Sequence, residues 1–423
     1  MNILLLNTSD SGGGAAVASS RLLKALGKAG KEVTMLVRDK RTQNSNIISV
    51  NTSWFQSKIN NLRFLLERLI IFCCNSFNKN NLFKVSIANT GVNITKNKLI
   101  INADIINLHW INQGFLSLKD IKKLLLLNKP VVWTLHDMWP CTGICHHAWT
   151  CNKFMQECGE CPFLHSNKMY DLSYKVWNRK KFVMSSNIHI VVVSSWLANR
   201  VKQSSLMCNL PVTIIPNAID TSVFYKREKT SLRRTLHLPL NKKIILMGAA
   251  RLDDPIKGFE YLKKALRLLS EENGRNSNLM LVLFGAIKDK MNFFEDLSIP
   301  YTSIGVLKDL NQIADLYSAA DVVVVPSLYE TFGQTIIESM ACGCPAVSFN
   351  NSGQTDIIDH KINGYLAKYL DVTDFAEGID WVLNRSNSED ISFSCVKKVQ
   401  TNYTENIVAE KYISLYKDIL KKC

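Results

Sequence analysis

Short apolar runs separated by helical patterns constrain the fold of this chain more than any other feature of its sequence. The runs are apolar on both faces and rich in Val, Ile and Leu, which predicts strands of parallel sheets covered by helices on each side. Two series are expected: Ile3–Leu6, Glu32–Val37, Ile105–His109, Val131–Leu135 and Ile188–Ser194, then Ile244–Gly248, Leu279–Phe284, Val322–Pro326 and Ala346–Asn350. The economical interpretation is an α/β chain with two βα domains in tandem.

The length supports this division, because 423 residues exceed one ordinary domain and suffice for two cores. Between the two series, the segment Ile214–Asn241 carries prolines and charges that are typical of a linker. Near the end of the chain, Ile407–Leu420 has apolar residues at helical spacing. The expected parts are a domain over residues 1–215, a linker over 216–240, a domain over 241–400 and a C-terminal helix within 401–423.

The net charge of +15 lies entirely in the first half of the chain. Residues 1–200 hold 25 Lys and Arg against 10 Asp and Glu, whereas residues 201–423 hold 26 of each kind. This asymmetry predicts an anionic partner for the first half, a membrane surface or a phosphorylated acceptor, against the alternative of a basic solvated surface. We expect no nucleic acid partner, because zinc-finger and helix-turn-helix spacings and aromatic RNA-recognition motifs are all absent from the sequence.

The sequence also bears on the compartment. No apolar run approaches the roughly 20 residues of a membrane-spanning helix. The first residues, Met1–Gly14, lack the basic start and the cleavage site of a signal peptide, so they predict a buried strand. We therefore expect a cytoplasmic protein, and peripheral attachment to the inner face of the cell membrane would suit its positive half.

One segment of the first half predicts a strongly amphipathic helix. Its apolar positions step by four and three: Phe55, Ile59, Leu62, Leu66, Leu69 and Cys73. We expect this face to cover a core, as most such faces do. A helix lying on a membrane is the alternative, because the domain is basic and Trp54 and Phe72 flank the stripe.

A glycine turn in the second series carries the clearest chemistry. After the strand that ends at Pro326, Gly333 permits a tight turn, and a helix then runs to Gly343. The helix N-terminus offers backbone N–H groups and a partial positive charge that suit a diphosphate. Glu338 and Glu330 could accept hydrogen bonds from ribose and sugar hydroxyls. Two ordinary surface glutamates are the alternative interpretation.

Two cations are expected at the same sheet edge. Arg251 ends the first strand of the second series, and Lys257 follows six residues later. Ligands of open α/β sheets bind outside the carboxyl ends of the strands, so both cations should lie near Glu330. Together they could neutralise a diphosphate without a metal. Because the sequence has no Asp-x-Asp pair, we expect no cofactor for catalysis.

These motifs together resemble glycosyltransferase family 4. Residues Glu330 to Pro345 resemble its E-x7-E signature, Arg251 with Lys257 resembles its diphosphate-binding pair, and residues 215–220 resemble its linker motif, with Ala218 where glycine is usual. The resemblance spans essentially the whole chain. It implies the GT-B fold, in which two Rossmann-like domains with parallel sheets face each other across a cleft and the last helix crosses back to the first domain. It also implies metal-free transfer with retained configuration, with a donor site that includes Thr331, Phe332, Gly333, Gln334 and Thr335.

The first domain offers a glycine loop and two histidines. Gly13 and Gly14 follow the first strand, but Val17 departs from Gly-x-Gly-x-x-Gly, so a bound dinucleotide is poorly supported. The family resemblance implies that this loop lies near the donor phosphates; a plain tight turn is the alternative. His109 and His136 end two strands. The resemblance implies that His136 contacts the transferred sugar, whereas a structural histidine is the alternative, favoured for His109.

The catalytic residues are expected to be His136, Arg251, Lys257 and Glu330. No pair of carboxylates can be placed on either side of the anomeric carbon, as hydrolases have. We therefore expect same-face transfer, in which the leaving diphosphate helps to take the acceptor proton and Arg251 and Lys257 stabilise it.

A cluster of cysteines follows His136 directly. A tetrahedral structural zinc site is expected at Cys145, Cys151, Cys158 and Cys161, with Cys141 left over. Buried thiols or disulfides and an iron–sulfur cluster are the alternatives. The insert makes the chain similar to the colanic acid biosynthesis branch of the family.

The resemblance thus implies a hexosyl- or deoxyhexosyltransferase that uses a UDP- or GDP-sugar and a lipid-linked oligosaccharide acceptor. Its pathway would be the assembly of bacterial O-antigen, capsule or exopolysaccharide. A sugar-nucleotide epimerase with the same fold and an inert nucleotide-sugar-binding scaffold are the rival interpretations.

Overall fold

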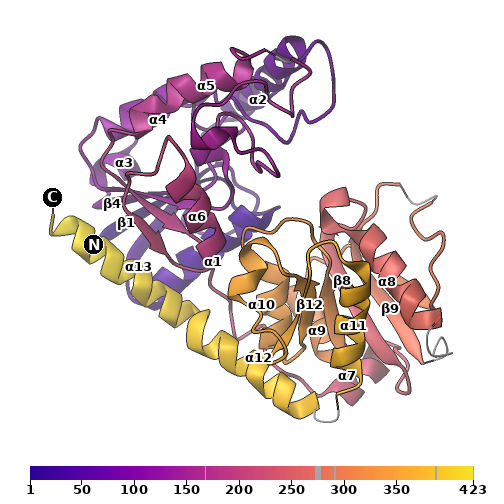
Figure 1. Cartoon of the computed structure of the whole chain (residues 1–423). Helices are drawn as coiled ribbons and strands as arrows, with labels where there is room; N and C mark the ends of the chain where they lie inside the picture. Colours follow the sequence, from indigo (N-terminus) through magenta and orange to yellow (C-terminus); the bar gives the residue numbers. More distant parts are fainter. Residues whose placement is uncertain (167, 272–277, 290–291, 386–387, 423) are drawn as a thin grey trace. The chain divides into compact units, whose positions relative to one another are not determined.

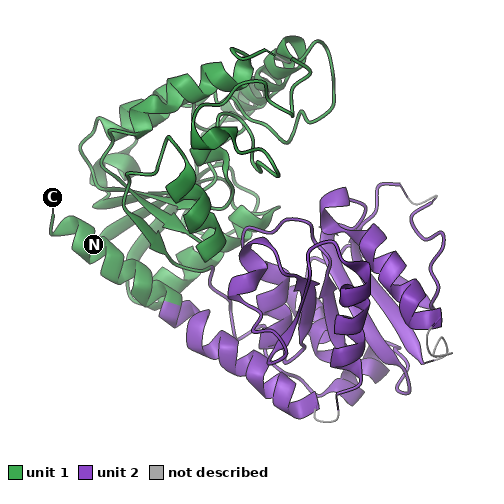
Figure 2. Ribbon diagram, viewed as in Figure 1, with its two compact units in different colours: residues 1–216, 408–423 green, residues 217–407 purple. Residues whose placement is uncertain are grey.

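The structure is a computed structural model that describes residues 1–166, 168–271, 278–289, 292–385 and 388–422 (Figure 1). It divides into two compact units, which Figure 2 distinguishes by colour. Unit 1 comprises Met1–Pro216 with Val408–Cys423, and unit 2 comprises Asn217–Ile407. The segment expected as a linker is counted almost entirely within unit 2, where it includes helix α7 (Lys229–Thr235).

Unit 1 is built on a seven-stranded parallel sheet in the order β3-β2-β1-β4-β5-β6-β7. Its strands are β1 (Asn2–Ser9), β2 (Glu32–Asp39), β3 (Ile47–Ser49), β4 (Ile105–Leu108), β5 (Val131–Leu135), β6 (Ile188–Val192) and β7 (Val212–Ile214). Its helices before the linker are α1 (Gly14–Lys28), α2 (Trp54–Cys74), α3 (Lys98–Asn102), α4 (Leu118–Leu125), α5 (Leu172–Lys180) and α6 (Ser195–Gln203). All five strands predicted for this sheet are present, and the two that were missed are short edge strands.

Unit 2 repeats the plan with a six-stranded parallel sheet in the order β10-β9-β8-β11-β12-β13. Its strands are β8 (Lys243–Arg251), β9 (Leu279–Ala286), β10 (Tyr301–Gly305), β11 (Val322–Val325), β12 (Ala346–Phe349) and β13 (Gly364–Ala367). Its further helices are α8 (Phe259–Glu271), α9 (Leu310–Ala319), α10 (Gln334–Ala341), α11 (Val372–Leu383) and α12 (Ser388–Asn402). Buried residues of β8, β9 and β11 form one apolar core with α8 and α11.

Both sheets reverse their strand order beside their first strand, as doubly wound sheets do. The reversal lies between β1 and β4 in unit 1 and between β8 and β11 in unit 2. Ligands of such sheets bind at the carboxyl ends of the strands where the order reverses. The two Rossmann-like units confirm the predicted α/β class, and each has one sheet edge at which a site is expected.

The C-terminal helix α13 (Glu405–Leu420) joins unit 1 from Val408 onward. Two buried tyrosines attach it to the sheet. Asn107 on β4 donates a hydrogen bond to Tyr416 Oη at 2.8 Å, and Thr134 on β5 lies 3.2 Å from Tyr412 Oη. The end of the chain is therefore fastened to the middle of the first sheet.

Helix α2 corrects one prediction. The helix is present, but the expectation that its apolar face covers a core is wrong. Phe55, Ile59, Leu62, Leu66, Leu69 and Cys73 are all exposed. The buried side instead carries Asn60, Glu67 and Arg68 together with Ile71, because the two charged side chains bind backbone groups beneath the helix. Among the described residues, no helix is both long and apolar enough to span a membrane.

Candidate active site

The carboxyl edge of the sheet in unit 2 brings together the predicted donor-site residues. The turn after β8 contains a short 3-10 helix, Pro255–Lys257, and Gly258 with φ of 70°. A Cβ at Gly258 would lie 1.9 Å from the carbonyl oxygen of Pro326, so only glycine allows this turn to pack against the end of β11. Leu328 N also donates a hydrogen bond to Ile256 O at 2.8 Å. These contacts fix the Lys257 turn beside the loop that carries Glu330.

Lys257 and Glu330 form an ion pair at this edge. Lys257 Nζ lies 2.7 Å from Glu330 Oε1, and the two side chains are 30% and 20% exposed. Burial alone would lower the pKa of Lys257, but the charge of Glu330 and its hydrogen bond raise that pKa above the ordinary value. The ammonium group is therefore held charged and positioned. The loop is braced further, since Glu330 N donates to Ser352 Oγ and Glu330 O accepts from Gly353 N.

Arg251 lies at the same edge but is more open to solvent. Its side chain is 52% exposed, and its Nε lies 3.1 Å from Asp253 Oδ1. The other oxygen of Asp253 accepts hydrogen bonds from the backbone N–H groups of Lys288 and Asp289. Asp253, which the sequence reasoning missed, thus ties the guanidinium to the loop after β9.

The predicted glycine turn opens α10 as expected. Gly333 has φ of 117° and is the N-cap residue, and Gly343, just after the helix, has φ of 76°. Glu338 lies on the second turn, where Tyr317 Oη donates to its Oε2 at 3.2 Å. Burial and the charge of Glu338 raise the pKa of Tyr317 well above its ordinary value, so the phenol remains a donor. The helix therefore begins at the edge that carries Lys257.

The corresponding edge of unit 1 carries the glycine loop. Gly12 and Gly13 have φ of 82° and 131°, and Gly13 is the N-cap residue of α1. No atom lies within 4 Å of where a Cβ of Gly13 would be, so its positive φ, not crowding, requires glycine. Asp10 anchors the loop by accepting hydrogen bonds from the backbone N–H groups of Arg41 and Thr42. Those bonds outweigh burial and lower the pKa of the Asp10 carboxyl.

His136 follows strand β5, and it pairs with His109, which follows β4, the strand beside β1. Nδ1 of His109 lies 2.9 Å from Nε2 of His136, and the two rings are stacked with centroids 5.2 Å apart. Burial lowers the pKa of His136 to about 4, although the charge of Asp137 opposes the shift. Burial and the neighbouring imidazole also lower the pKa of His109 well below its ordinary value. Both rings are therefore neutral at physiological pH.

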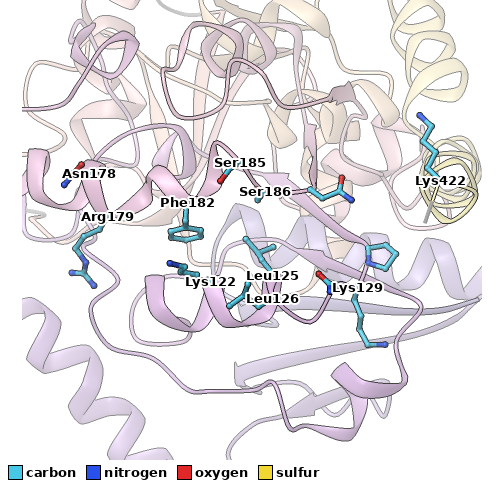
Figure 3. Close-up of a pocket in the computed structure, with 13 residues that line it drawn as sticks. Lys122, Leu125, Leu126, Lys129, Asn178, Arg179, Phe182, Ser185, Ser186 and Lys422 are labelled. Atoms are coloured by element: carbon cyan, nitrogen blue, oxygen red, sulfur yellow. The ribbon is translucent and has the colours of Figure 1, made fainter.

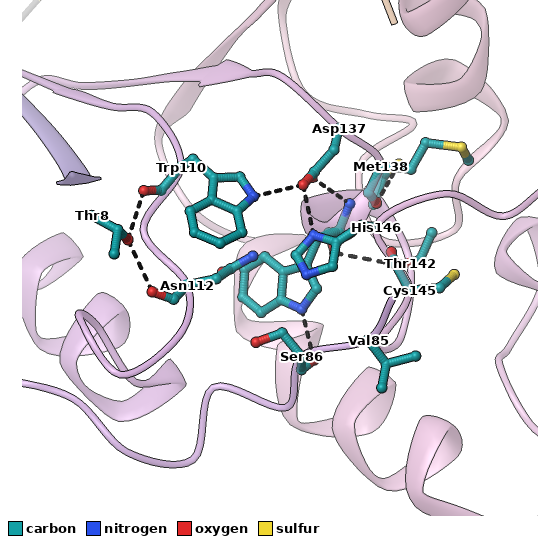
Figure 4. A network of polar contacts seen from close by, with 12 residues as sticks. Thr8, Val85, Ser86, Trp110, Asn112, Asp137, Met138, Thr142, Cys145 and His146 are labelled. Atoms are coloured by element: carbon teal, nitrogen blue, oxygen red, sulfur yellow. Dashed lines mark hydrogen bonds and ion pairs between the residues drawn. The ribbon is translucent and has the colours of Figure 1, made fainter. Parts of the chain in front are cut away.

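Asp137, which follows His136 in the sequence, is the centre of a polar network with Trp110 and His146 (Figure 4). Its Oδ2 accepts from Trp110 Nε1 at 2.8 Å and lies 2.6 Å from His146 Nδ1, and its Oδ1 accepts from Trp139 N. Burial would raise the pKa of Asp137, but His146, His147 and the hydrogen bond from Trp139 N lower it, so the carboxylate stays charged. The residue adjacent to His136 in sequence is thus a structural anchor. The place of Asp137 directly after His136 could have suggested this role from the sequence. Its hydrogen-bond partners Trp110 and His146 could not have been inferred from sequence spacing.

A separate hollow of about 890 Å³ lies at the opposite edge of the same sheet (Figure 3). It is lined by the end of α4, by residues 178–187 and by the loops before β5 and β6, with Lys122, Lys129, Arg179 and Lys422 among its side chains. None of the predicted site residues lines it, so we do not assign it to the candidate active site.

The cysteine insert forms a compact lobe of unit 1. The four predicted ligands Cys145, Cys151, Cys158 and Cys161 line one cavity of about 20 Å³, whereas Cys141 is apart from it. Burial raises the pKa of Cys158 to about 11 and that of Cys161 to about 12. The described cysteines are free thiols. Within the described ranges, no group of three or more His, Cys, Asp or Glu is arranged to hold a metal ion. The four thiols are brought together, and their zinc stays a prediction.

Comparison with known proteins identifies the class that this fold and site define. The family model for Glycosyltransferase Family 4 matches residues 12–223, and that for glycosyl transferases group 1 matches residues 228–392. The chain belongs to glycosyltransferase family 4 and has a GT-B-like fold.

Curated relatives agree with this assignment. The chain is 28% identical over 287 residues to an uncharacterized glycosyltransferase of Methanocaldococcus jannaschii, an alignment that covers 65% of this chain and 70% of the relative. It is 21% identical over 250 residues to the capsular polysaccharide biosynthesis glycosyltransferase CapM of Staphylococcus aureus, covering 57% of this chain and 65% of the relative. Several other relatives, the D-inositol 3-phosphate glycosyltransferases of Stackebrandtia nassauensis, Acidothermus cellulolyticus and Streptosporangium roseum, are matched over less than half of their length.

Solved structures share the fold over the full chain. The sucrose-phosphate synthase of Thermosynechococcus elongatus superposes with a TM-score of 0.68 at 19% identity, covering 100% of both chains. HepE of Anabaena, solved in complex with UDP-glucose, has a TM-score of 0.63 at 14% identity and covers 99% of this chain and 100% of its own. At such identities the likeness shows the fold alone.

Proposed function

We propose that this glycosyltransferase is a retaining enzyme that moves a hexosyl or deoxyhexosyl group from a UDP- or GDP-sugar to a lipid-diphosphate-linked oligosaccharide. The observation that carries the proposal is the ion pair between Lys257 and Glu330 beside the N-terminus of α10. A positioned cation next to a helix N-terminus suits a diphosphate, and a carboxylate within the same loop suits sugar hydroxyls.

In this proposal, Lys257 and Arg251 bind the donor diphosphate and stabilise the charge that develops as it leaves. Glu330 orients the transferred sugar, and Glu338, which Tyr317 holds, accepts from the ribose. The backbone at Thr331, Phe332, Gly333, Gln334 and Thr335 forms the rest of the donor pocket. Two cations and a helix N-terminus supply the neutralisation that a metal would otherwise give, so catalysis needs no cofactor.

In the same proposal, the edge of unit 1 contributes uncharged groups. Gly13 and Gly14 allow the backbone to approach the ligand closely. The neutral imidazole of His136 exchanges hydrogen bonds with a sugar hydroxyl without adding charge. Transfer proceeds on one face of the sugar: the bond from the anomeric carbon to the diphosphate breaks, the acceptor oxygen bonds to the same face, and its proton passes to the departing phosphate.

The acceptor and the pathway are proposed from charge and from the relatives. The positive half of the chain suits an acceptor that carries a diphosphate and lies at an anionic inner membrane surface. CapM acts in capsular polysaccharide biosynthesis, and the structural neighbour WaaG is involved in lipopolysaccharide biosynthesis, by their names. We place this enzyme in the assembly of a bacterial surface polysaccharide, O-antigen, capsule or exopolysaccharide, at the cytoplasmic face of the membrane.

The test is donor binding by the purified full chain. A panel of UDP- and GDP-sugars is screened for thermal stabilisation with and without EDTA, because a ligand that binds only the folded state raises the unfolding temperature. We expect one donor to stabilise the protein in both conditions, and its sugar to be transferred only when an acceptor is present. Consumption of the donor without acceptor would instead support an epimerase, and binding without any turnover would support an inert scaffold.

Structural zinc at Cys145, Cys151, Cys158 and Cys161 remains part of the proposal, because four thiols around one small cavity offer the soft ligands that zinc prefers. Metal analysis of the purified protein tests it. About one equivalent of zinc that is lost in a Cys158→Ser variant supports the site, while protein without zinc or iron refutes it.

A further inference from the structure

Helix α2 exposes its apolar face to solvent. Trp54, Phe55 and Leu62 are 66%, 72% and 64% exposed. Further exposed apolar side chains continue the same surface along the helix: Ile59, Leu65, Leu66 and Leu69. We call these seven residues the α2 apolar face. A soluble monomer rarely leaves so many large apolar side chains together in water, so this face is expected to have a partner.

The underside of α2 explains why the helix does not turn this face inward. Glu67 is fully buried, and its Oε1 accepts hydrogen bonds from Ser86 Oγ at 2.6 Å and from the N–H groups of Ile87 and Ala88. Arg68, also buried, donates from Nη1 to the carbonyl oxygens of Leu82 and Val85. Rotating the helix to bury its leucines would remove these partners from two charged groups, which is costly. The hydrogen bonds of Glu67 and Arg68 therefore stabilise the orientation in which the α2 apolar face is exposed.

Charge indicates what covers the face. Residues 51–103 contain seven Lys and Arg but a single acidic residue, Glu67, which is buried. Lys58, Lys79 and Lys84 are exposed, and Lys58 Nζ lies 5.1 Å from the centre of the Trp54 ring. A second copy of this chain would bring these cations against each other, whereas an anionic surface would attract them. An apolar face with Trp and Phe that also carries Lys58, in a basic segment of the chain, is the composition of helices that lie in the headgroup layer of a membrane.

We propose that the α2 apolar face binds the surface of an anionic phospholipid bilayer, with the helix lying parallel to it. The side chains of Trp54, Phe55 and Leu62 enter the boundary between headgroups and acyl chains, and the exposed lysines contact lipid phosphates. The proposal rests on the proposed function in one respect, since a lipid-linked acceptor gives the attachment its purpose.

A chain of bonds within unit 1 connects this surface to the candidate site. Glu67 binds Ser86, whose carbonyl oxygen accepts a hydrogen bond from Trp139 Nε1 at 2.8 Å. Trp139 N in turn donates to Asp137, the neighbour of His136. A membrane-bound α2 would therefore hold the His136 edge at a fixed position relative to the bilayer, where a lipid-linked acceptor presents its sugar.

Flotation of the full chain with lipid vesicles tests the proposal. Vesicles of phosphatidylcholine alone are compared with vesicles that contain about a third phosphatidylglycerol, at low salt and at about 0.15 M salt. We expect binding to the anionic vesicles, weakened by salt. A Trp54→Ser/Phe55→Ser/Leu62→Ser variant should bind at least about tenfold less, and a Lys58→Glu/Lys79→Glu variant should lose the preference for anionic lipid.

The control is Phe393→Ser in unit 2, whose side chain is 68% exposed and which should bind like the wild type. Donor binding by thermal shift is measured on every variant, which separates failure here from failure of the proposed function and also verifies folding. The proposal is overturned if the wild type ignores anionic vesicles, or if the triple variant floats as well as the Phe393 control. A triple variant that instead converts a dimer to a monomer, with vesicle binding unchanged, would assign the face to a second copy of this chain.

Discussion

The two sheets end in edges of opposite chemistry. The edge of unit 2 is ionic, with Lys257 paired to Glu330 and Arg251 paired to Asp253. The edge of unit 1 is neutral at its centre, where burial keeps the two stacked imidazoles of His109 and His136 uncharged. Both edges arise from the same strand order, so the difference comes from the side chains that follow each strand.

Under the proposed function, this difference corresponds to two tasks that the transfer of a sugar requires. Departure of a diphosphate is helped by fixed positive charge, because such charge stabilises the developing negative charge more effectively than water does. Orientation of a hydroxyl needs a hydrogen-bonding group that does not alter the charge balance. In the proposed mechanism, the ionic edge of unit 2 serves the first need and the neutral edge of unit 1 serves the second.

The largest effect is expected from removing the cation of the ionic edge. Lys257→Met should lower the rate of sugar transfer about 100- to 1000-fold, because it removes the charge that stabilises the leaving group and leaves Glu330 without its partner. The measurement is kcat/KM for the donor. Lys398→Met is the matched control, since Lys398 forms a comparable pair with Asp359 in the same unit. Rates within about threefold of the wild type in the Lys257 variant would remove the basis for the ionic edge.

The two edges should also respond to opposite extremes of pH. The folded pKa of His136, about 4, lies below its unfolded value near 6.5, so the unfolded state binds more protons in that interval and stability falls as the pH drops from 6.5 to 4. The loss attributable to His136 is up to about 3 kcal/mol, and less where water reaches the ring. Lys257 has a raised pKa, so its stabilising contribution is complete below about 10.5 and disappears only as the pH rises beyond it.

Urea unfolding at pH 4.5 and pH 7 measures the acid side of this contrast. His136→Gln should reduce the difference in unfolding free energy between the two pH values, because a glutamine does not titrate. An unchanged difference would mean that the imidazole is not the group that responds to acid.

A smaller effect is expected for the exposed cation. Arg251→Ala should reduce transfer about 10- to 100-fold while leaving the unfolding temperature nearly unchanged, because the side chain is half exposed and holds little of the fold together. The measurement combines kinetics with thermal unfolding. Loss of stability comparable to the loss of activity would reassign Arg251 to a structural role.

The smallest effect on turnover is expected from the neutral edge. His136→Gln should lower kcat about tenfold with little change in donor affinity, because glutamine retains a hydrogen bond but loses the ring geometry. Calorimetric donor binding beside steady-state rates distinguishes the two quantities. A loss of donor affinity as large as that of the Lys257 variant would show that the edges do not divide the work as proposed.

Much of the architecture could be predicted from local pattern. Apolar runs identified nine of the thirteen described strands, and the glycines at 333 and 343 marked the ends of α10, because backbone conformation there is set by residues close in sequence. The four strands that were missed lie at the edges of the two sheets. Strands β3 and β7 have only three residues, which give no period to read, and β10 and β13 contain no run of Val, Ile and Leu. Glu330, the ion-pair partner of Lys257, could be placed at the same sheet edge as Lys257 because the carboxyl ends of parallel strands lie together.

What the sequence determined by itself is the two-domain α/β plan and the identity of the side chains that follow the strands. The tertiary structure alone decided which way α2 faces, how His136 pairs with His109, and which carboxylates brace Arg251 and the His136 edge. The physical reason is the separation along the sequence between the residues that interact. Periodicity reports a helix and its stripe, but the burial of Glu67 and Arg68 depends on backbone groups 14 to 21 residues away, whose positions no local pattern specifies.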